Sequence, residues 1–249
     1  MEYKKLFISI IFIFIVASLT TSALTNNSME KERKENVPQY YYSGKEMDKV
    51  SAYIEQQYGE YENVMHEIVS PDIHCDIVVV PPTEKQPYYK LVTLGAGAYK
   101  MNIPKEMKSA VCDRAEYVIF LPKNWNIESE KEEDYWPIRM LKTIARLTVN
   151  TDSWLCYTHT IQLTQDGSPV AENTGFNSCV LLPSTGKNQQ EVYPLKIGFF
   201  GKEVAFYQLC PLYPEEMEFK LKHSFDELMG RSDIENNLII NIHRKNYCK

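Results

Sequence analysis

Short apolar runs, each closed by proline or glycine, are the feature of this sequence that most limits its fold. DIVVV at 76–80 is followed by two prolines, and the run at 88–94 is followed by Gly95 and Gly97. Runs of this length, rich in β-branched and aromatic residues and bounded by turn residues, are typical of strands. Further runs of this kind lie at 114–121, 159–163, 179–182, 195–200 and 204–209.

Helical patterns lie between and after these strands. Ser43 and Glu46 form a capping-box pattern, and Gly59 is placed to end the helix that follows. A second helix is predicted to open at Trp136-Pro137, because proline is tolerated at the first helical position, and a third opens at Pro214. Helices and strands are mixed without strict βαβ alternation, so the predicted fold class is α+β, in a single domain.

The stretch FYQLCPLYPEEMEFKLKHSFDELM at 206–229 gathers a cysteine, glutamates and a histidine, so it could be either a catalytic cluster or a strand-to-helix corner. Pro211 is expected to close the strand, because proline cannot donate to a ladder. One continuous helix is then predicted to run to Gly230, with a buried stripe of Met217, Leu221, Phe225 and Leu228. Two i,i+4 pairs are predicted on this helix, Glu216–Lys220 and Glu218–Lys222. Each charge has a helix-stabilising explanation, which favours the structural interpretation.

The first residues, MEYKKLFISIIFIFIVASLTTSALT, are typical of a targeting segment. Residues 1–23 are interpreted as a signal peptide or a signal anchor, residues 24–42 as a polar linker, and residues 43–249 as the folded domain. We therefore expect a protein that is exported, secreted or periplasmic, or else anchored in the membrane. In this interpretation the chain touches a membrane only through the N-terminal segment, and only if that segment is not cleaved.

The net charge of −6 argues against a nucleic-acid partner, because neutralising phosphates requires a basic surface. The six cysteines fit either disulfides in an oxidising compartment or buried free thiols. The cysteines and histidines show no metal-ligand spacing such as C-x-x-C or H-E-x-x-H, so neither a metal nor another cofactor is predicted.

His74-Cys75-Asp76 has the residue types of a nucleophile set, but neighbours on a strand point to opposite faces, so Cys75 and His74 are not expected to pair. The segments WPIR at 136–139 and DSW at 152–154 mix large aromatic rings with charge. Their tryptophans either cap the core or belong to a recognition surface, where Trp, Tyr and Arg are enriched.

Six blocks of sequence together resemble the suppressor-of-fused domain in its bacterial form. In chain order they are IHCDIVVVPPT, YYKLVTLGAGAYKMNIP, RAEYVIFLPKNW, YWPIRMLKTIAR, TDSWLCYTHTI and FYQLCPLYPEEMEFKLKH. The resemblance covers about residues 45–235 and implies a mostly antiparallel mixed sheet with packed helices and no known catalysis. Larger animal relatives bind and restrain zinc-finger transcription factors of Hedgehog signalling, and bacterial members have been proposed as immunity proteins that neutralise toxins.

The resulting hypothesis is a non-catalytic protein-binding domain that is not an enzyme, with a toxin domain as the specific partner. The leader is not typical of cytoplasmic immunity proteins and suggests a toxin met outside the cytoplasm or at the membrane. The candidate partner-binding residues are Trp136, Arg139, Asp152, Trp154, His159, Tyr213 and Glu216. The alternative hypothesis is an exported hydrolase that uses Cys75 or Cys210 with a histidine.

Overall fold

The computed structural model describes residues 40–70, 72–198, 202–236 and 238–249. The predicted targeting segment and most of the predicted linker lie outside these residues. Within the described chain, no helix is long and apolar enough to cross a membrane. Tyr40 and Tyr42, at the end of the predicted linker, belong to the packed structure: Tyr40 forms a bridge with Ile73, and Tyr42 is buried.

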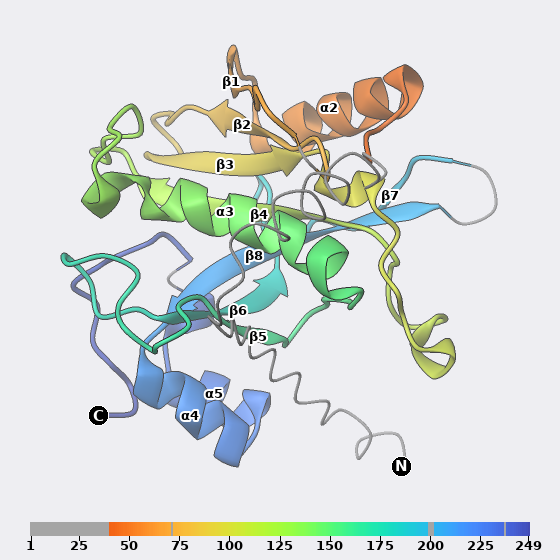
Figure 1. Ribbon diagram of the computed structural model, residues 1–249. Coiled ribbons are helices and arrows are strands. Elements are labelled where there is room, and N and C mark those ends of the chain that lie inside the picture. The colour runs from red at the N-terminus through yellow and green to blue at the C-terminus, as the bar shows by residue number, and fades with distance from the viewer. Residues whose placement is uncertain (1–39, 71, 199–201, 237) are drawn as a thin grey trace, which may run out of the picture.

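One mixed sheet of eight strands organises the described chain, in the order β1-β2-β3-β4-β8-β6-β5, with β7 paired to β8 (Figure 1). All neighbours are antiparallel except β4 and β8. The α+β class and the mostly antiparallel sheet are therefore confirmed. The strands are β1 (Asn63–Met65), β2 (Asp76–Val80), β3 (Tyr88–Leu94), β4 (Ala115–Pro122), β5 (Thr160–Gln162), β6 (Ser178–Pro183), β7 (Leu195–Lys196) and β8 (Glu203–Leu212).

Helices cover both faces of this sheet (Figure 1). Alternate residues of the central strands, such as Ile77 and Val78, face opposite sides. The side with Ile77 packs on α3, and the side with Val78 packs on α2, so the central strands are buried on both faces. The helices are α2 (Gly44–Tyr58), α3 (Glu132–Thr151), α4 (Pro214–Lys222) and α5 (Phe225–Arg231), with short 3-10 turns η2 (Ala96–Ala98), η3 (Lys105–Met107) and η4 (Ile234–Asn236).

The caps of α2 are those that the sequence predicts. The carboxylate of Glu46 accepts from the backbone N–H of Ser43 at 3.0 Å. Gly59 ends the helix with a φ of 125°, a conformation that glycine adopts without steric cost. The start of α3 differs from the prediction, because the helix begins at Glu132 rather than at Trp136.

Pro137 therefore lies inside α3, where it cannot donate to the carbonyl of Glu133. The side-chain amide of Asn173 donates to that carbonyl at 2.8 Å and replaces the missing bond. This long-range contact explains why a local rule placed the helix start too late.

The prediction that Pro211 closes its strand is also wrong, since β8 continues to Leu212. β4 pairs with β8 only as far as Val118 and Gln208. Beyond that point, the side of β8 that faces β4 has no strand partner among the described residues. The carbonyl of Pro211 accepts from Arg244 at 2.9 Å. Proline is tolerated here because a strand edge needs no N–H donor.

The predicted continuous helix at 214–230 is two helices, α4 and α5, with the break at His223. The hydroxyl of Ser224 caps α5 by accepting from the backbone N–H of Glu227 at 3.0 Å. The predicted pair of Glu218 and Lys222 is present at 2.6 Å. The predicted pair of Glu216 with Lys220 is wrong, because Glu216 points inward to Arg244.

Candidate functional site

The seven candidate residues fall into two groups, at the two ends of α3. Three of them are buried: Trp136 is 1 % exposed, Trp154 8 % and Glu216 0 %. These three side chains cannot form a contact surface without rearrangement, which corrects the prediction for them. Their aromatic and charged character serves the core.

Trp136 belongs to a ladder of aromatic rings at the N-terminal half of α3. Its ring lies 6.0 Å from that of Trp125 and 6.3 Å from that of Phe176. The ring of Tyr213 lies 4.7 Å from that of Phe176, and the Tyr213 hydroxyl donates to the carbonyl of Arg244 at 2.8 Å. Tyr213 is thus a half-buried packing residue rather than an exposed contact.

Glu216 and Arg244 form a buried ion pair that fixes the C-terminal segment (residues 238–249). The guanidinium donates to both carboxylate oxygens, at 2.6 and 2.5 Å. The backbone N–H groups of Tyr213 and Tyr247 also donate to this carboxylate, each at 3.0 Å. Removing either charged partner would leave the other charge buried and unpaired.

Arg139 lies half-buried on α3. It pairs with Glu132 and donates to the carbonyl of Val170 at 2.8 Å. The side chain therefore ties α3 to the loop between β5 and β6, and only part of it reaches the surface.

Asp152 lies at the C-terminal end of α3, and Trp154 and His159 lie in the segment between α3 and β5. Asp152 ends the helix in the left-handed conformation and accepts from the Asn102 amide at 3.2 Å. The rings of Trp154 and His159 lie 4.6 Å apart. Burial, with the nearby Lys220 ammonium, lowers the pKa of His159 to about 4, so this histidine is neutral at pH 7.

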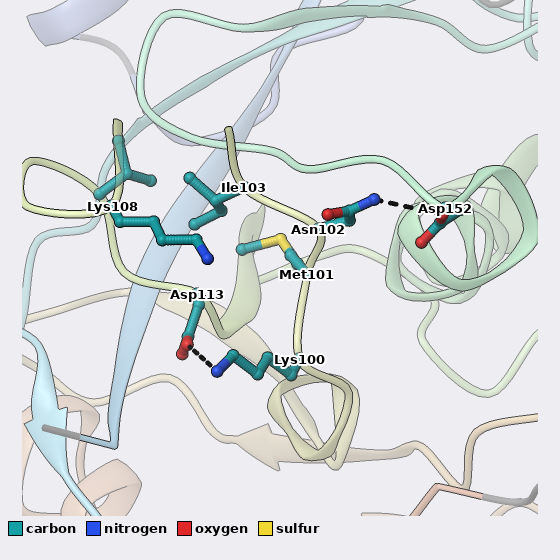
Figure 2. Close-up of a pocket in the computed structure, with 8 residues that line it drawn as sticks. Lys100, Met101, Asn102, Ile103, Lys108, Asp113 and Asp152 are labelled. Atoms are coloured by element: carbon teal, nitrogen blue, oxygen red, sulfur yellow. Dashed lines mark hydrogen bonds and ion pairs between the residues drawn. The ribbon is translucent and has the colours of Figure 1, made fainter. Parts of the chain in front are cut away.

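A hollow of about 360 Å³ opens beside Asp152 (Figure 2). We call it the Asp152 hollow. Its charged side chains are of both signs, and Lys100 pairs with Asp113 across it at 3.3 Å. Lys108 makes no ion pair within the described chain. The lining residues are Lys100, Met101, Asn102, Ile103, Lys108, Val111, Asp113 and Asp152.

The loop that carries most of this hollow is anchored by the buried carboxyl of Glu116. The hydroxyls of Tyr42 and Thr93 donate to it at 2.7 and 2.6 Å. The backbone N–H groups of residues 95–97 donate to it at 3.0–3.2 Å. Burial raises the pKa of Glu116, while these hydrogen bonds act in the opposite direction. The backbone of the GAGA stretch at 95–98 thus binds a carboxyl group of the chain itself, that of Glu116.

Sequence reasoning found one residue of the Asp152 hollow and missed the rest. The loop at 99–113 has no hydrophobic period, and only residues 99–104 belong to one of the six blocks that carry the family resemblance. Only Gly95 and Gly97, which precede this loop, and the carboxyl group that their backbone binds could have indicated a fixed loop. Glu116 lies in an apolar strand run, where its partners are not apparent.

His74 and Asp76 share one side of the chain, as predicted, and Cys75 faces the other. The Nε2 atom of His74 lies 3.4 Å from Asp76, and its Nδ1 atom lies 2.8 Å from the Ser70 hydroxyl. That hydroxyl donates its proton to Glu67 at 2.8 Å, so it faces His74 as an acceptor. The arrangement therefore does not place His74 as a base for Ser70.

The two cysteines of the hydrolase hypothesis are buried. Cys75 is 1 % exposed, and burial raises the pKa of its thiol well above the usual range. Burial also raises the pKa of Cys210 to about 12. Nucleophilic cysteines need an accessible thiolate. All six cysteines are free in the described chain, where no set of three or more metal-binding side chains comes together.

Comparison with known proteins places the chain in a family. The model of the suppressor of fused protein (SUFU) family matches residues 71–245. This match covers more than half of the sequence, so the chain belongs to the SUFU family. A search of curated proteins found no match.

Solved structures agree in fold. A SUFU homologue from Neisseria gonorrhoeae FA 1090 is similar with a TM-score of 0.54 at 17% identity, over 83% of this chain and 96% of that one. A chain of the Sufu-Fu complex crystal structure is similar with a TM-score of 0.52 at 12% identity, over 80% of this chain and 88% of that one. At such identities the likeness concerns the fold alone.

Proposed function

We propose that this chain is a non-catalytic domain that binds a protein partner at the Asp152 hollow. The observation that carries the proposal is the lining of this hollow. The half-buried apolar side chain of Val111 lies among charged side chains of both signs, and the buried side chains of Met101 and Ile103 also line the hollow. An apolar centre with a charged rim is the usual composition of a specific protein interface. Membership of the SUFU family supports the same conclusion, since a relative of this fold is in a Sufu-Fu complex.

The specific function that we propose is immunity, in which the domain binds and neutralises a toxin domain. The apolar N-terminal segment of the sequence supports an encounter outside the cytoplasm or at the membrane. Charged groups at the rim of the hollow would favour a partner with complementary charge and speed the encounter.

The test first searches the neighbouring genes for a secreted protein with a toxic domain, and it then uses that domain together with the full chain. Cells that produce the toxic domain should grow when the chain is co-produced and should stop growing when the chain carries Lys108→Glu. Lys108 is exposed and makes no ion pair within the described chain, so this change should leave the fold intact. Glu84→Lys, an exposed charge reversal between β2 and β3, is the matched control and should still protect.

Equal protection by the Lys108→Glu and Glu84→Lys variants would rule out the Asp152 hollow as the contact. Failure of the unmodified chain to protect would rule out immunity to that toxin.

The hydrolase alternative has its own test. In the native protein at pH 7.5, a thiol-directed reagent should leave Cys75 and Cys210 unlabelled, because both thiols are buried and protonated. Both should react after unfolding in denaturant. Rapid labelling of either one in the native state would revive the hydrolase hypothesis.

A further inference from the structure

A second hollow, of about 580 Å³, lies at the other end of α3. We call it the Asn173 groove. It is built from four separate parts of the chain: the turn after β4, the first turn of α3, the loop before β6 and the C-terminal segment. Its lining residues are Pro122, Asn124, Trp125, Asn126, Asp134, Asn173, Ile239, Ile240, Asn241, Ile242 and His243. None of these is a candidate from the sequence.

The walls of the groove are fixed by contacts to the body of the domain. The indole N–H of Trp125 donates to the carbonyl of Asp134 at 2.9 Å. The side-chain N–H of Asn173 donates a hydrogen bond to the backbone carbonyl of Glu133. The side-chain oxygen of Asn173 is buried without a partner in the described chain. The opposite wall is tied down where the N–H of Ile240 donates to Phe120 at 2.9 Å. A preformed groove of this kind costs little ordering on binding.

The groove offers groups that suit an extended peptide. Asparagine side chains both donate and accept, as peptide groups do. The backbone N–H groups of Asn241 and Ile242 donate to no other group within the described chain. Ile239 is 37 % exposed and supplies an apolar contact between these polar groups. Backbone hydrogen bonds with alternating side-chain contacts are the usual mode of recognising an extended chain.

Asp134 is the carboxylate among the residues that line the groove, and the segment that follows Asn126 in the sequence is acidic. Residues 128–134 read ESEKEED, five carboxylates against one lysine. Two of the carboxylates have cation partners: Glu132 pairs with Arg139, and Glu133 pairs with Lys131. No ion pair involves Glu128, Glu130 or Asp134 in the described part of the chain.

Negative charge in the first turn stabilises a helix through its dipole, which explains Glu132, Glu133 and Asp134 without a ligand. Glu128 and Glu130 precede α3, however, and lie in the segment that joins the Trp125 turn to the helix. The helix dipole alone therefore leaves these two carboxylates unexplained.

We propose that the Asn173 groove binds an extended, basic peptide segment of a protein partner. The inference rests on the proposed protein-binding function and adds a second contact site with a stated chemistry. Its polar groups would hold the peptide backbone, and the unpaired carboxylates would attract lysine or arginine side chains of the peptide. Such attraction is weakened by salt.

The test measures the fluorescence anisotropy of labelled decapeptides mixed with the full chain. The first probe carries four lysines among valine, alanine and serine, and its analogues carry glutamine or glutamate in place of the lysines. We expect the lysine peptide to bind at least tenfold more tightly than the glutamine analogue, and the glutamate analogue not to bind. Raising the salt concentration should weaken the lysine peptide most.

Variants locate the binding. The double variant Glu128→Gln/Glu130→Gln and the single variant Ile239→Ser should each weaken the lysine peptide three- to tenfold. The control Glu60→Gln/Glu84→Gln removes two exposed carboxylates elsewhere and should bind as the unmodified chain does. Circular dichroism checks that each variant is folded.

Equal binding of the lysine and glutamine peptides, or equal weakening by the control variant, would overturn the groove proposal. Because Lys108 lies in the other hollow, Lys108→Glu should not change peptide binding. If the peptide fails to bind but the chain still protects against the toxin, the groove proposal alone is wrong.

Discussion

The Asp152 hollow and the Asn173 groove lie at opposite ends of α3, and each depends on a buried carboxyl group. α3 has 20 residues and spans about 30 Å. The loop at the Asp152 end is held by Glu116, whose partners are hydroxyl and backbone N–H donors. The segment at the Asn173 end is held by Glu216, whose main partner is the Arg244 cation.

This difference separates two ways of fixing a site. Where several neutral donors bind a carboxyl group, removing one lowers the free energy of unfolding only partly, because the others still bind it. Where one buried cation is the main partner, its removal lowers the free energy of unfolding more, because the carboxylate is left as an uncompensated buried charge. The Asn173 end is therefore the more easily disrupted by one substitution, and the Asp152 end is the more tolerant.

The largest expected effect is that of Arg244→Met. Breaking a buried ion pair by removing one partner costs about 3–5 kcal/mol. Urea unfolding should show this loss, and hydrogen exchange should increase in the C-terminal segment before it increases at 95–113. The double variant Arg244→Met/Glu216→Gln is the control and should recover part of the stability. A loss below about 1 kcal/mol would contradict the role assigned to the pair.

Tyr42→Phe should have a smaller effect, at the Asp152 end. It removes one donor of several to Glu116, and a hydrogen bond to a charged group contributes about 1.5–3 kcal/mol. The free energy of unfolding in urea at pH 7 measures it. Tyr41→Phe, at an exposed position next to it, serves as control. An effect as large as that of Arg244→Met would remove the contrast between the two ends.

His159 predicts a dependence of stability on pH at the Asp152 end. Its pKa in the folded protein is about 4, against the ordinary value of 6.5, so the unfolded chain binds more protons between these values. Stability should therefore fall as pH decreases from 6.5 to 4, by about 1–2 kcal/mol for this partly exposed group. The variant His159→Asn should show less of this dependence. Identical profiles for the two proteins would refute the assignment.

The smallest expected effect is that of Lys222→Ala, which removes the exposed pair with Glu218 on α4. Such pairs contribute about 0.3–0.5 kcal/mol or less. The midpoint of thermal unfolding should shift by no more than about 2 °C. A shift several times larger would mean that this exposed pair stabilises the fold more than its geometry predicts.

Much of the fold could be predicted from local patterns. The strands at 76–80 and 88–94 and the caps of α2 follow from residues adjacent in sequence. The errors occur where distant parts of the chain override a local rule: Asn173 donates to the carbonyl that Pro137 leaves without a donor in α3, and β4 stops pairing with β8 before Pro211, so no N–H donor is needed there. No local rule contains these partners.

The candidate sites were less predictable. Asp152 was proposed from its charge beside Trp154, and it does lie at a hollow. Trp136 and Glu216 were proposed from the same residue types and are core residues, because composition does not reveal which way a side chain points. The Asn173 groove combines four segments far apart in sequence, so only the folded chain brings its asparagines together.

The most direct test of the account is the dissociation constant of the full chain with the toxic domain, measured by calorimetry with the unmodified protein and with Lys108→Glu. The account predicts a tight complex whose dissociation constant rises at least tenfold in the variant, while the Glu84→Lys control binds normally. The same dissociation constant for all three proteins would contradict a contact at the Asp152 hollow.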